Sequence, residues 1–271
     1  MNSRLVCCTT ILLAMVCVPL HTASAQSATA DPGDWSSYGG DAGFNRYVPL
    51  DQINRDNVTS LKQVWRWNSI DEPLYDGPER LRRGFFKSTP LMVGGRLFVS
   101  TALNQVAAVD AGTGETLWEF NPRAYNEPGG RNVFQHRGVG YWTDGTDERV
   151  IMGTTTRQLI ALNAKTGELY PDFGENGLVD MGKGLDRPIE ETQLRFTAPP
   201  MIIRDTIILG CVMPDEASNP GIPPGHIRGY DVRTGALKWV FYNIPRKGEF
   251  GYETWEDGSA ETAGAANAWS M

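Results

Sequence analysis

Several short segments of this chain carry side chains that suit the binding of charged or aromatic ligands. An arginine guanidinium presents a planar fork of donors that matches carbonyl and carboxylate oxygens. A hard divalent cation prefers carboxylate oxygens, and a tryptophan ring offers a large face for stacking. Each of these residues can also have an ordinary structural role: the arginine on the surface, the acid solvated in a loop, or the tryptophan packed between sheets. The residues concerned are His136, Arg137, Thr197, Asp215, Glu216 and Trp269.

Cysteine chemistry contributes little to this chain. Cys7, Cys8 and Cys17 lie in a predicted leader, so Cys211 is the single cysteine expected in the mature protein. One cysteine forms neither an internal disulfide nor a cysteine metal cluster. The sequence also has no C-x-x-C-H haem motif.

The first 25 residues have the pattern of a secretory signal. Arg4 precedes an apolar stretch over residues 5–20, and Ala23-Ser24-Ala25 provides an A-x-A cleavage site. A retained membrane anchor is the alternative, but residues 5–20 are fewer than the roughly 20 apolar residues that a membrane span needs. No later stretch of the sequence is long and apolar enough to cross a bilayer. We therefore expect a periplasmic protein in which residues 26–271 form the N-terminal part of one domain, with no transmembrane segment after cleavage.

The charge balance argues against nucleic acid as a partner. Without the leader, 24 basic residues face 32 acidic ones, which leaves a formal charge of −8. An acidic surface repels phosphate backbones. The 30 Gly, 17 Pro and 8 Trp are typical of a turn-rich, secreted all-β protein.

Three copies of one turn motif must position the candidate residues. In each copy an Asp or Asn side chain can bond turn amides, Gly supplies a positive φ and Thr locks the corner, which predicts a β-hairpin. An aromatic residue follows and is expected to dock on the neighbouring unit. The second copy has Pro171 in place of that aromatic, so Tyr170 or Phe173 is expected to substitute. The copies are Asp110…Thr113-Gly114…Trp118, Asn163…Thr166-Gly167…Tyr170 and Asp231…Thr234-Gly235…Trp239.

Further apolar runs complete each repeat. Residues 89–93 with 95–99, and 200–203 with 206–209, form strand pairs upstream of the first and third copies. Two hairpins per repeat make a four-stranded blade of a β-propeller. Unrelated hairpins in a β-sandwich are the alternative, but they do not explain the recurring turn. Three to four blades leave unpaired edges, so we expect the N-terminal portion of a longer protein.

Five motifs outside the repeats carry a resemblance to a known family. In their order and content they resemble the pyrroloquinoline quinone (PQQ) dependent dehydrogenases, especially the members that act on glucose or on a broad range of alcohols. The resemblance runs from about Trp35 to the end of the chain. It implies an all-β, eight-bladed propeller with PQQ on its axis beside a divalent cation, usually Ca²⁺. The motifs are residues 35–41, 45–54, 136–139, 197–200 and 251–255.

The resemblance also implies roles for individual residues. Arg137 is expected to bond the quinone, His136 to lie near one face of it, and Thr197 to bond a PQQ carboxylate. Trp269 is expected to form the floor under the ring. Lys87 stands where alcohol-oxidising relatives have a glutamate, so it either pairs with a PQQ carboxylate or marks a different subgroup. Because adjacent cysteines are lacking near His136, the sugar or polyol branch is favoured.

This chain contains only part of the metal site and of the catalytic residues that the resemblance implies. The resemblance implies that Asp215 supplies a carboxylate to the metal, with Glu216 as the near alternative. The general-base aspartate of the family is expected beyond Met271, so we assign no catalytic residue within this chain. The fragment alone is therefore expected to be inactive.

Two classes of function remain open at this point. The first is periplasmic oxidation of a sugar or alcohol hydroxyl by hydride transfer to PQQ, with electrons passed to a respiratory quinone or cytochrome c. The second is a cofactor-free propeller that serves as a binding or assembly scaffold, which has no reason to keep Arg137, Asp215 and Trp269 together. A truncated product with exposed blade faces is a further alternative.

Overall fold

A computed structural model describes residues 33–41, 43–78, 81–128, 135–185, 189–190, 193–216, 219 and 222–268. The predicted leader and Trp269 lie outside these residues. Within the described ranges, no helix has the length and apolar character that crossing a bilayer requires.

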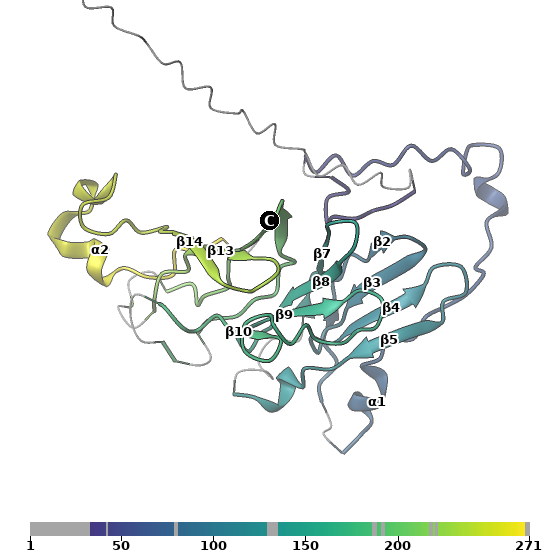
Figure 1. Ribbon diagram of the computed structural model, residues 1–271, viewed down its shortest axis with the longest axis horizontal. Coiled ribbons are helices and arrows are strands. Elements are labelled where there is room, and N and C mark those ends of the chain that lie inside the picture. Colours follow the sequence, from purple (N-terminus) through teal and green to yellow (C-terminus); the bar gives the residue numbers. More distant parts are fainter. Residues whose placement is uncertain are drawn as a thin grey trace, which may run out of the picture.

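Three four-stranded antiparallel sheets follow one another along the chain (Figure 1). The first contains β2 (Leu91–Val93), β3 (Arg96–Ser100), β4 (Val106–Asp110) and β5 (Thr116–Phe120). The second contains β7 (Gly140–Thr143), β8 (Glu148–Gly153), β9 (Gln158–Asn163) and β10 (Leu178–Asp180). The third contains β11 (Met201–Ile203), β12 (Thr206–Leu209), β13 (Ile227–Asp231) and β14 (Leu237–Phe241). Each strand pairs with the next one in the chain, so the predicted all-β blades are confirmed.

The remaining elements are short. A two-residue parallel pair joins β1 (Phe85–Phe86) to β6 (Gln135–His136). The α-helices are single turns, α1 (Glu72–Tyr75) and α2 (Ser259–Thr262). The 3₁₀ turns are η1 (Val58–Ser60), η2 (Ala124–Asn126), η3 (Tyr252–Thr254) and η4 (Glu256–Gly258).

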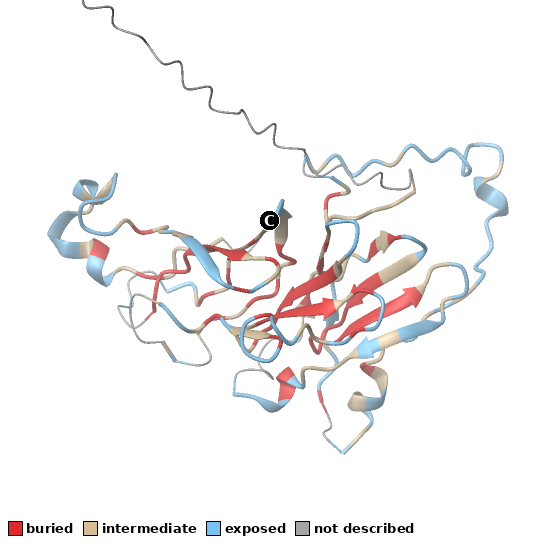
Figure 2. Ribbon diagram, viewed as in Figure 1, coloured by how far each residue is buried: buried red, intermediate tan, exposed pale blue. Residues whose placement is uncertain are grey.

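The core lies between the faces of successive sheets. Residues of β8 and β9 are buried on both faces, because the second sheet packs against the first on one side and the third on the other. Strands buried on both faces are expected to be almost continuously apolar, as β9 is. Figure 2 shows β5, β14 and α2 as more exposed elements at the margins.

The turn motif forms the hairpin corners as predicted. The Asp110 carboxylate accepts hydrogen bonds from the Gly112 and Thr113 amides and from the Thr113 hydroxyl, at 2.8–3.0 Å. Asp231 and Thr234 repeat this arrangement in the third sheet. These carboxylates are stabilised in their charged form, and backbone and hydroxyl donors of Thr113 lower the pKa of Asp110.

An indole ring covers the corner glycine of the following sheet. A Cβ atom on Gly167 would lie 2.6 Å from the Trp118 ring, and one on Gly114 would lie 2.6 Å from Trp65. Both indoles also donate a hydrogen bond of 3.1 Å to the carbonyl that follows the corner Asp or Asn, at Ala164 for Trp118. The predicted docking on the neighbouring unit is therefore confirmed for Trp118.

The second sheet uses a different aromatic residue at this contact. Phe173 is fully buried, and its ring lies 3.3 Å from the Cβ position of Gly235. Tyr170 instead lies under the Arg149 guanidinium, 3.8 Å from Cζ to the ring centroid. Of the two expected substitutes, Phe173 docks on the corner, because the chain turns at residues 170–177 before β10 begins.

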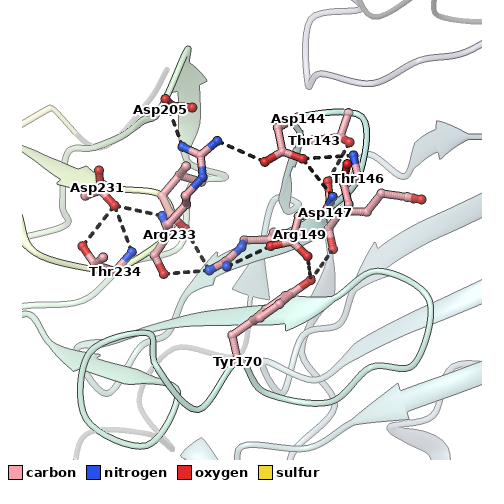
Figure 3. A network of polar contacts seen from close by, with 12 residues as sticks. Thr143, Asp144, Thr146, Asp147, Arg149, Tyr170, Asp205, Asp231, Arg233 and Thr234 are labelled. Carbon is pink, nitrogen blue, oxygen red and sulfur yellow. Dashed lines mark hydrogen bonds and ion pairs between the residues drawn. The ribbon is translucent and has the colours of Figure 1, made fainter.

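Two arginines, Arg149 buried and Arg96 partly buried, link the sheets at equivalent positions. Arg96 of β3 lies opposite Asp110 of β4 in the strand register. Its guanidinium donates a hydrogen bond of 2.9 Å to the Ala164 carbonyl of the second sheet. Arg149 occupies the matching place in β8 and donates to the Arg233 carbonyl of the third sheet at 2.8 Å (Figure 3). The sequence reasoning missed both arginines.

A second arginine strengthens the junction in Figure 3. Arg233 forms ion pairs with Asp144 of the second sheet, at 3.1 Å, and with Asp205 of the third, at 3.0 Å. Turn amides of Asp147 and Thr146, together with Arg233, lower the pKa of Asp144 to about 2. These partly exposed pairs each contribute little, because water screens them.

Replacing a corner glycine tests the indole contact. We expect Gly167→Ala to lower the free energy of unfolding by about 2–5 kcal/mol, since a methyl group meets the Trp118 ring and positive φ is strained. Gly145→Ala is the matched control, because Gly145 also has positive φ (+92°) but an added Cβ meets nothing within 4 Å. It should cost only about 1–2 kcal/mol in urea unfolding. Equal losses in the two variants would contradict the docking role.

Replacing Arg149 tests the link between the second and third sheets. Lysine keeps the charge but cannot reproduce the planar fork, so Arg149→Lys should lower the free energy of unfolding by about 2 kcal/mol. Arg66→Lys, at an exposed position, is the control and should stay within about 0.5 kcal/mol. Thermal unfolding of both variants measures the difference, and an unchanged Arg149→Lys protein would disprove the link.

Candidate cofactor site

Four of the candidate residues, Lys87, His136, Arg137 and Thr197, lie on the segments that lead into the first strand of each sheet. We call residues 85–89, 135–139 and 195–199 the entry segments. Their backbones are joined by two hydrogen bonds of 2.9 Å, from the Thr89 amide to the Arg137 carbonyl and from the Arg137 amide to the Thr197 carbonyl. The three entry segments therefore lie side by side, with Arg137 on the middle one.

A glycine after Arg137 allows this close approach. Gly138 has φ of +149°, and an added Cβ would lie 3.1 Å from the Thr89 carbonyl oxygen. A Cβ on Gly140 would lie 2.9 Å from the Pro200 carbonyl oxygen. Larger residues at either position would push the entry segments apart.

The structure joins Arg137 to Thr197, two of the residues predicted from the resemblance. The half-buried Arg137 guanidinium donates a hydrogen bond of 2.8 Å to the Thr197 hydroxyl oxygen. Thr197 is only 1 % exposed, so it has one well-defined environment. Its contact holds the guanidinium plane and leaves the hydroxyl proton able to donate.

Lys87 provides a second cation on the neighbouring entry segment. It follows β1 by one residue, as Arg137 follows β6, and the parallel register pairs Phe86 with His136. The Lys87 side chain is exposed, with its ammonium 5.3 Å from the centroid of the Phe85 ring. Two cationic side chains thus follow neighbouring strand ends.

His136 is placed differently from these two cations. Its ring is fully buried, with Nε2 at 2.8 Å from the Gly153 carbonyl oxygen and Nδ1 at 3.0 Å from the Ser100 hydroxyl. Burial lowers the pKa of His136 to about 4, and the nearby charge of Arg137 acts in the same direction. The ring is neutral and engaged by protein atoms at both nitrogens. Its expected place near one face of the cofactor stays a prediction.

The proposed metal ligands lie in an exposed loop. Asp215 and Glu216 follow a β-bridge between Arg195 and Val212, which ties this loop to the third entry segment. The Glu216 carboxylate accepts a hydrogen bond of 2.9 Å from Asn219. Among the described residues, no three His, Cys, Asp or Glu side chains converge as a metal site. A hard cation takes several oxygen ligands, so two carboxylates could supply only part of its shell.

The segment before Trp269 runs beside the third sheet. Gly225 and Asn267 form a parallel bridge, and the Gly225 amide donates to the Ala266 carbonyl at 2.8 Å. Gly210 has no room for a Cβ, because it would overlap the Ala268 carbonyl. The described residues thus bring the chain to Ala268 at the end of β12, while Trp269 itself stays outside them.

Sequence reasoning missed the contacts that support this site. Ser100 contacts His136, and Ser88 contacts Ser100 at 3.2 Å. Neither serine belongs to a motif, and one of them ends an ordinary strand. Nothing in the residue spacing marks them, because the contact to His136 spans 36 positions.

The buried imidazole makes stability depend on pH. Its pKa of about 4 lies below the ordinary 6.5, so the unfolded chain binds more protons between these values. The neutral His136 ring therefore contributes roughly 3 kcal/mol to the free energy of unfolding. This contribution is complete above pH 6.5 and is lost as the pH falls towards 4. We expect His136→Asn to remove this part of the slope in urea unfolding between pH 6.5 and 4. If the free energy of unfolding fell with pH equally steeply in the variant and the unsubstituted protein, the role of His136 would be contradicted.

Comparison with known proteins gives a consistent family. The family model described as "Glucose/ethanol/alcohol dehydrogenase, beta-propeller domain" of the PQQ group matches residues 35–271. The quinate/shikimate dehydrogenase (quinone) of Acinetobacter baylyi is 33 % identical over 260 residues, covering 88 % of this chain and 30 % of the relative. Quinoprotein glucose dehydrogenase A of Acinetobacter calcoaceticus is 32 % identical over 248 residues, covering 82 % and 30 %.

Solved structures agree with this assignment. The quinohemoprotein alcohol dehydrogenase from Comamonas testosteroni has a TM-score of 0.68 and 26 % sequence identity, covering 90 % of this chain and 34 % of that protein. The chain spans about a third of the length of the relatives it matches. From its repeats, its three blades and these similarities, the chain belongs to the family of PQQ-dependent glucose, ethanol and alcohol dehydrogenases.

Proposed function

We propose that the protein to which this sequence belongs is a PQQ-dependent dehydrogenase that oxidises a hydroxyl group of a sugar or alcohol. The observation that carries this proposal is the placement of Arg137 and Lys87 at neighbouring strand ends of a propeller of this family. A cofactor-free scaffold has no need for two cations there.

The donor set fits the chemistry of PQQ. This planar ortho-quinone bears three carboxylates, so it needs cationic donors with defined orientation. The Arg137 fork, oriented by Thr197, suits adjacent carbonyl and carboxylate oxygens. Lys87 adds an exposed point charge that can approach a further carboxylate. PQQ, when bound, accepts hydride from the substrate carbon.

Other residues complete the proposed site. We assign Asp215, with Glu216 as the alternative, to Ca²⁺ or another divalent cation, which the carboxylates would hold as part of a larger shell. Trp269 is proposed as the stacking floor under the cofactor. The general base is assigned to an aspartate outside this sequence, so this segment alone should not turn over substrate.

Substrate class, acceptor and location are part of the same proposal. Relatives are named for glucose, for quinate and shikimate, and for alcohol, and several names specify quinone. We propose a sugar or alcohol substrate and electron transfer to a respiratory quinone or cytochrome c. The signal pattern of residues 1–25 supports a periplasmic location.

Cofactor titration tests this function. The protein at its natural length, titrated with PQQ and Ca²⁺, should show quenching of tryptophan fluorescence and should reduce an electron-accepting dye with glucose or an alcohol. Arg137→Lys should raise the Kd for PQQ by about 10–100-fold, because a bidentate charged contact is lost. Arg66→Lys, at an exposed position, should leave it unchanged. If saturating cofactor produced no quenching and no dye reduction, this result would exclude the enzyme and favour the scaffold.

A further inference from the structure

A chain of hydrogen bonds connects two of the entry segments through the first and second sheets. Ser88 Oγ lies 3.2 Å from Ser100 Oγ, which lies 3.0 Å from His136 Nδ1. His136 Nε2 lies 2.8 Å from the Gly153 carbonyl oxygen. We call these four residues the Ser–His chain.

The chemistry of the groups sets the direction of this chain. A carbonyl oxygen only accepts, so Nε2 carries the proton and donates to Gly153. In the neutral ring Nδ1 then accepts, from the Ser100 hydroxyl and from the Gly138 amide at 3.3 Å. Because Ser100 donates to the ring, its oxygen accepts from Ser88. Every donor in the Ser–His chain therefore has one defined acceptor.

The ends of the Ser–His chain lie next to the two cations. Ser88 directly follows Lys87, and His136 directly precedes Arg137. Ser100 ends β3 and Gly153 ends β8, so the links are anchored on the first and second sheets. Ser100 and His136 are fully buried, which protects their hydrogen bond from competition with water.

On the basis of the proposed function, we propose that the Ser–His chain sets the position of Arg137 relative to Lys87, with His136 as a positioning residue that does not contact the cofactor. His136 and Arg137 share a peptide bond, so the contacts that hold the His136 ring also restrict the Arg137 backbone, which is bonded to both neighbouring entry segments. A cofactor with carboxylates at fixed separations binds well only when the spacing of its cationic partners is also fixed.

Removing one hydroxyl tests the proposal with little change in volume. Ser100→Ala in the natural-length protein should raise the Kd for PQQ, measured by tryptophan quenching, by about 10-fold. Thr101→Val is the matched control: it removes a buried hydroxyl one residue away, which donates to Asp71 at 2.6 Å and lies outside the Ser–His chain. Thr101→Val should lower the melting temperature about as much as Ser100→Ala does, and it should leave the Kd for PQQ unchanged.

A double-mutant cycle shows whether the effect passes through Arg137. In an Arg137→Lys background, Ser100→Ala should raise the Kd by less than about 3-fold, because the group it positions is already gone. Ser88→Ala, which leaves the contacts of the His136 ring in place, is the second variant if Ser100→Ala fails to fold. It should raise the Kd in the same direction by a smaller factor.

The negative results separate the two proposals. PQQ binding by the unsubstituted protein with an unchanged Kd in Ser100→Ala and Ser88→Ala would overturn the positioning role and leave the proposed function intact. An equal rise in Kd for Thr101→Val would also overturn it, since general loosening would then explain the effect. Failure of the unsubstituted protein to bind PQQ would overturn both proposals.

Discussion

The contact between an aromatic ring and the corner glycine of the next sheet determines how the sheets follow one another. Trp118 lies so close to Gly167 that a single methyl group would not fit between them. The ring adds a hydrogen bond to the Ala164 carbonyl, so both its distance and its direction are specified. An apolar contact without such a bond could slide, whereas this one fixes the angle between two sheets.

Arginine side chains of the same sheets add hydrogen bonds to these junctions. Arg96 and Arg149 each leave the second strand of one sheet and donate to carbonyls at the corner of the next sheet. The Ala164 carbonyl accepts from both Trp118 and Arg96, so two side chains of the first sheet hold one corner of the second. The third sheet has Thr206 at the equivalent position, opposite Asp231. The described residues therefore contain two complete junctions of this kind.

The candidate site follows from the regular spacing of the sheets. Because each sheet is rotated and displaced by the same kind of junction, the entry segments lie close enough to exchange backbone hydrogen bonds. Arg137 lies on the middle segment, with Lys87 and Thr197 on its neighbours. Small residues such as Gly138 are required here, since the distance between segments is set by backbone atoms rather than by side chains.

Local turn chemistry made much of the architecture predictable from the sequence. Asp110, Thr113 and Gly114 act on atoms within four positions of one another, so their hairpin can be recognised without knowledge of the rest of the chain. The same reasoning identified the blades and the docking of Trp118 on the next corner, but it missed Trp65, which covers Gly114. The association of Arg137 with Thr197 came from the family resemblance, and the structure places the two side chains in contact.

The tertiary structure alone decided which side chains face the interior of the site region. His136 belongs to a motif with Arg137, yet one side chain is buried between sheets and the other is half-buried beside Thr197. Ser100, at the end of β3, and Gly153, at the end of β8, reach His136 only because the first and second sheets pack against each other. Trp269 lies outside the described residues, so its role was decided by neither route. Short-range hydrogen bonds are encoded by neighbouring residues, whereas contacts across 17 to 36 positions depend on how whole sheets pack.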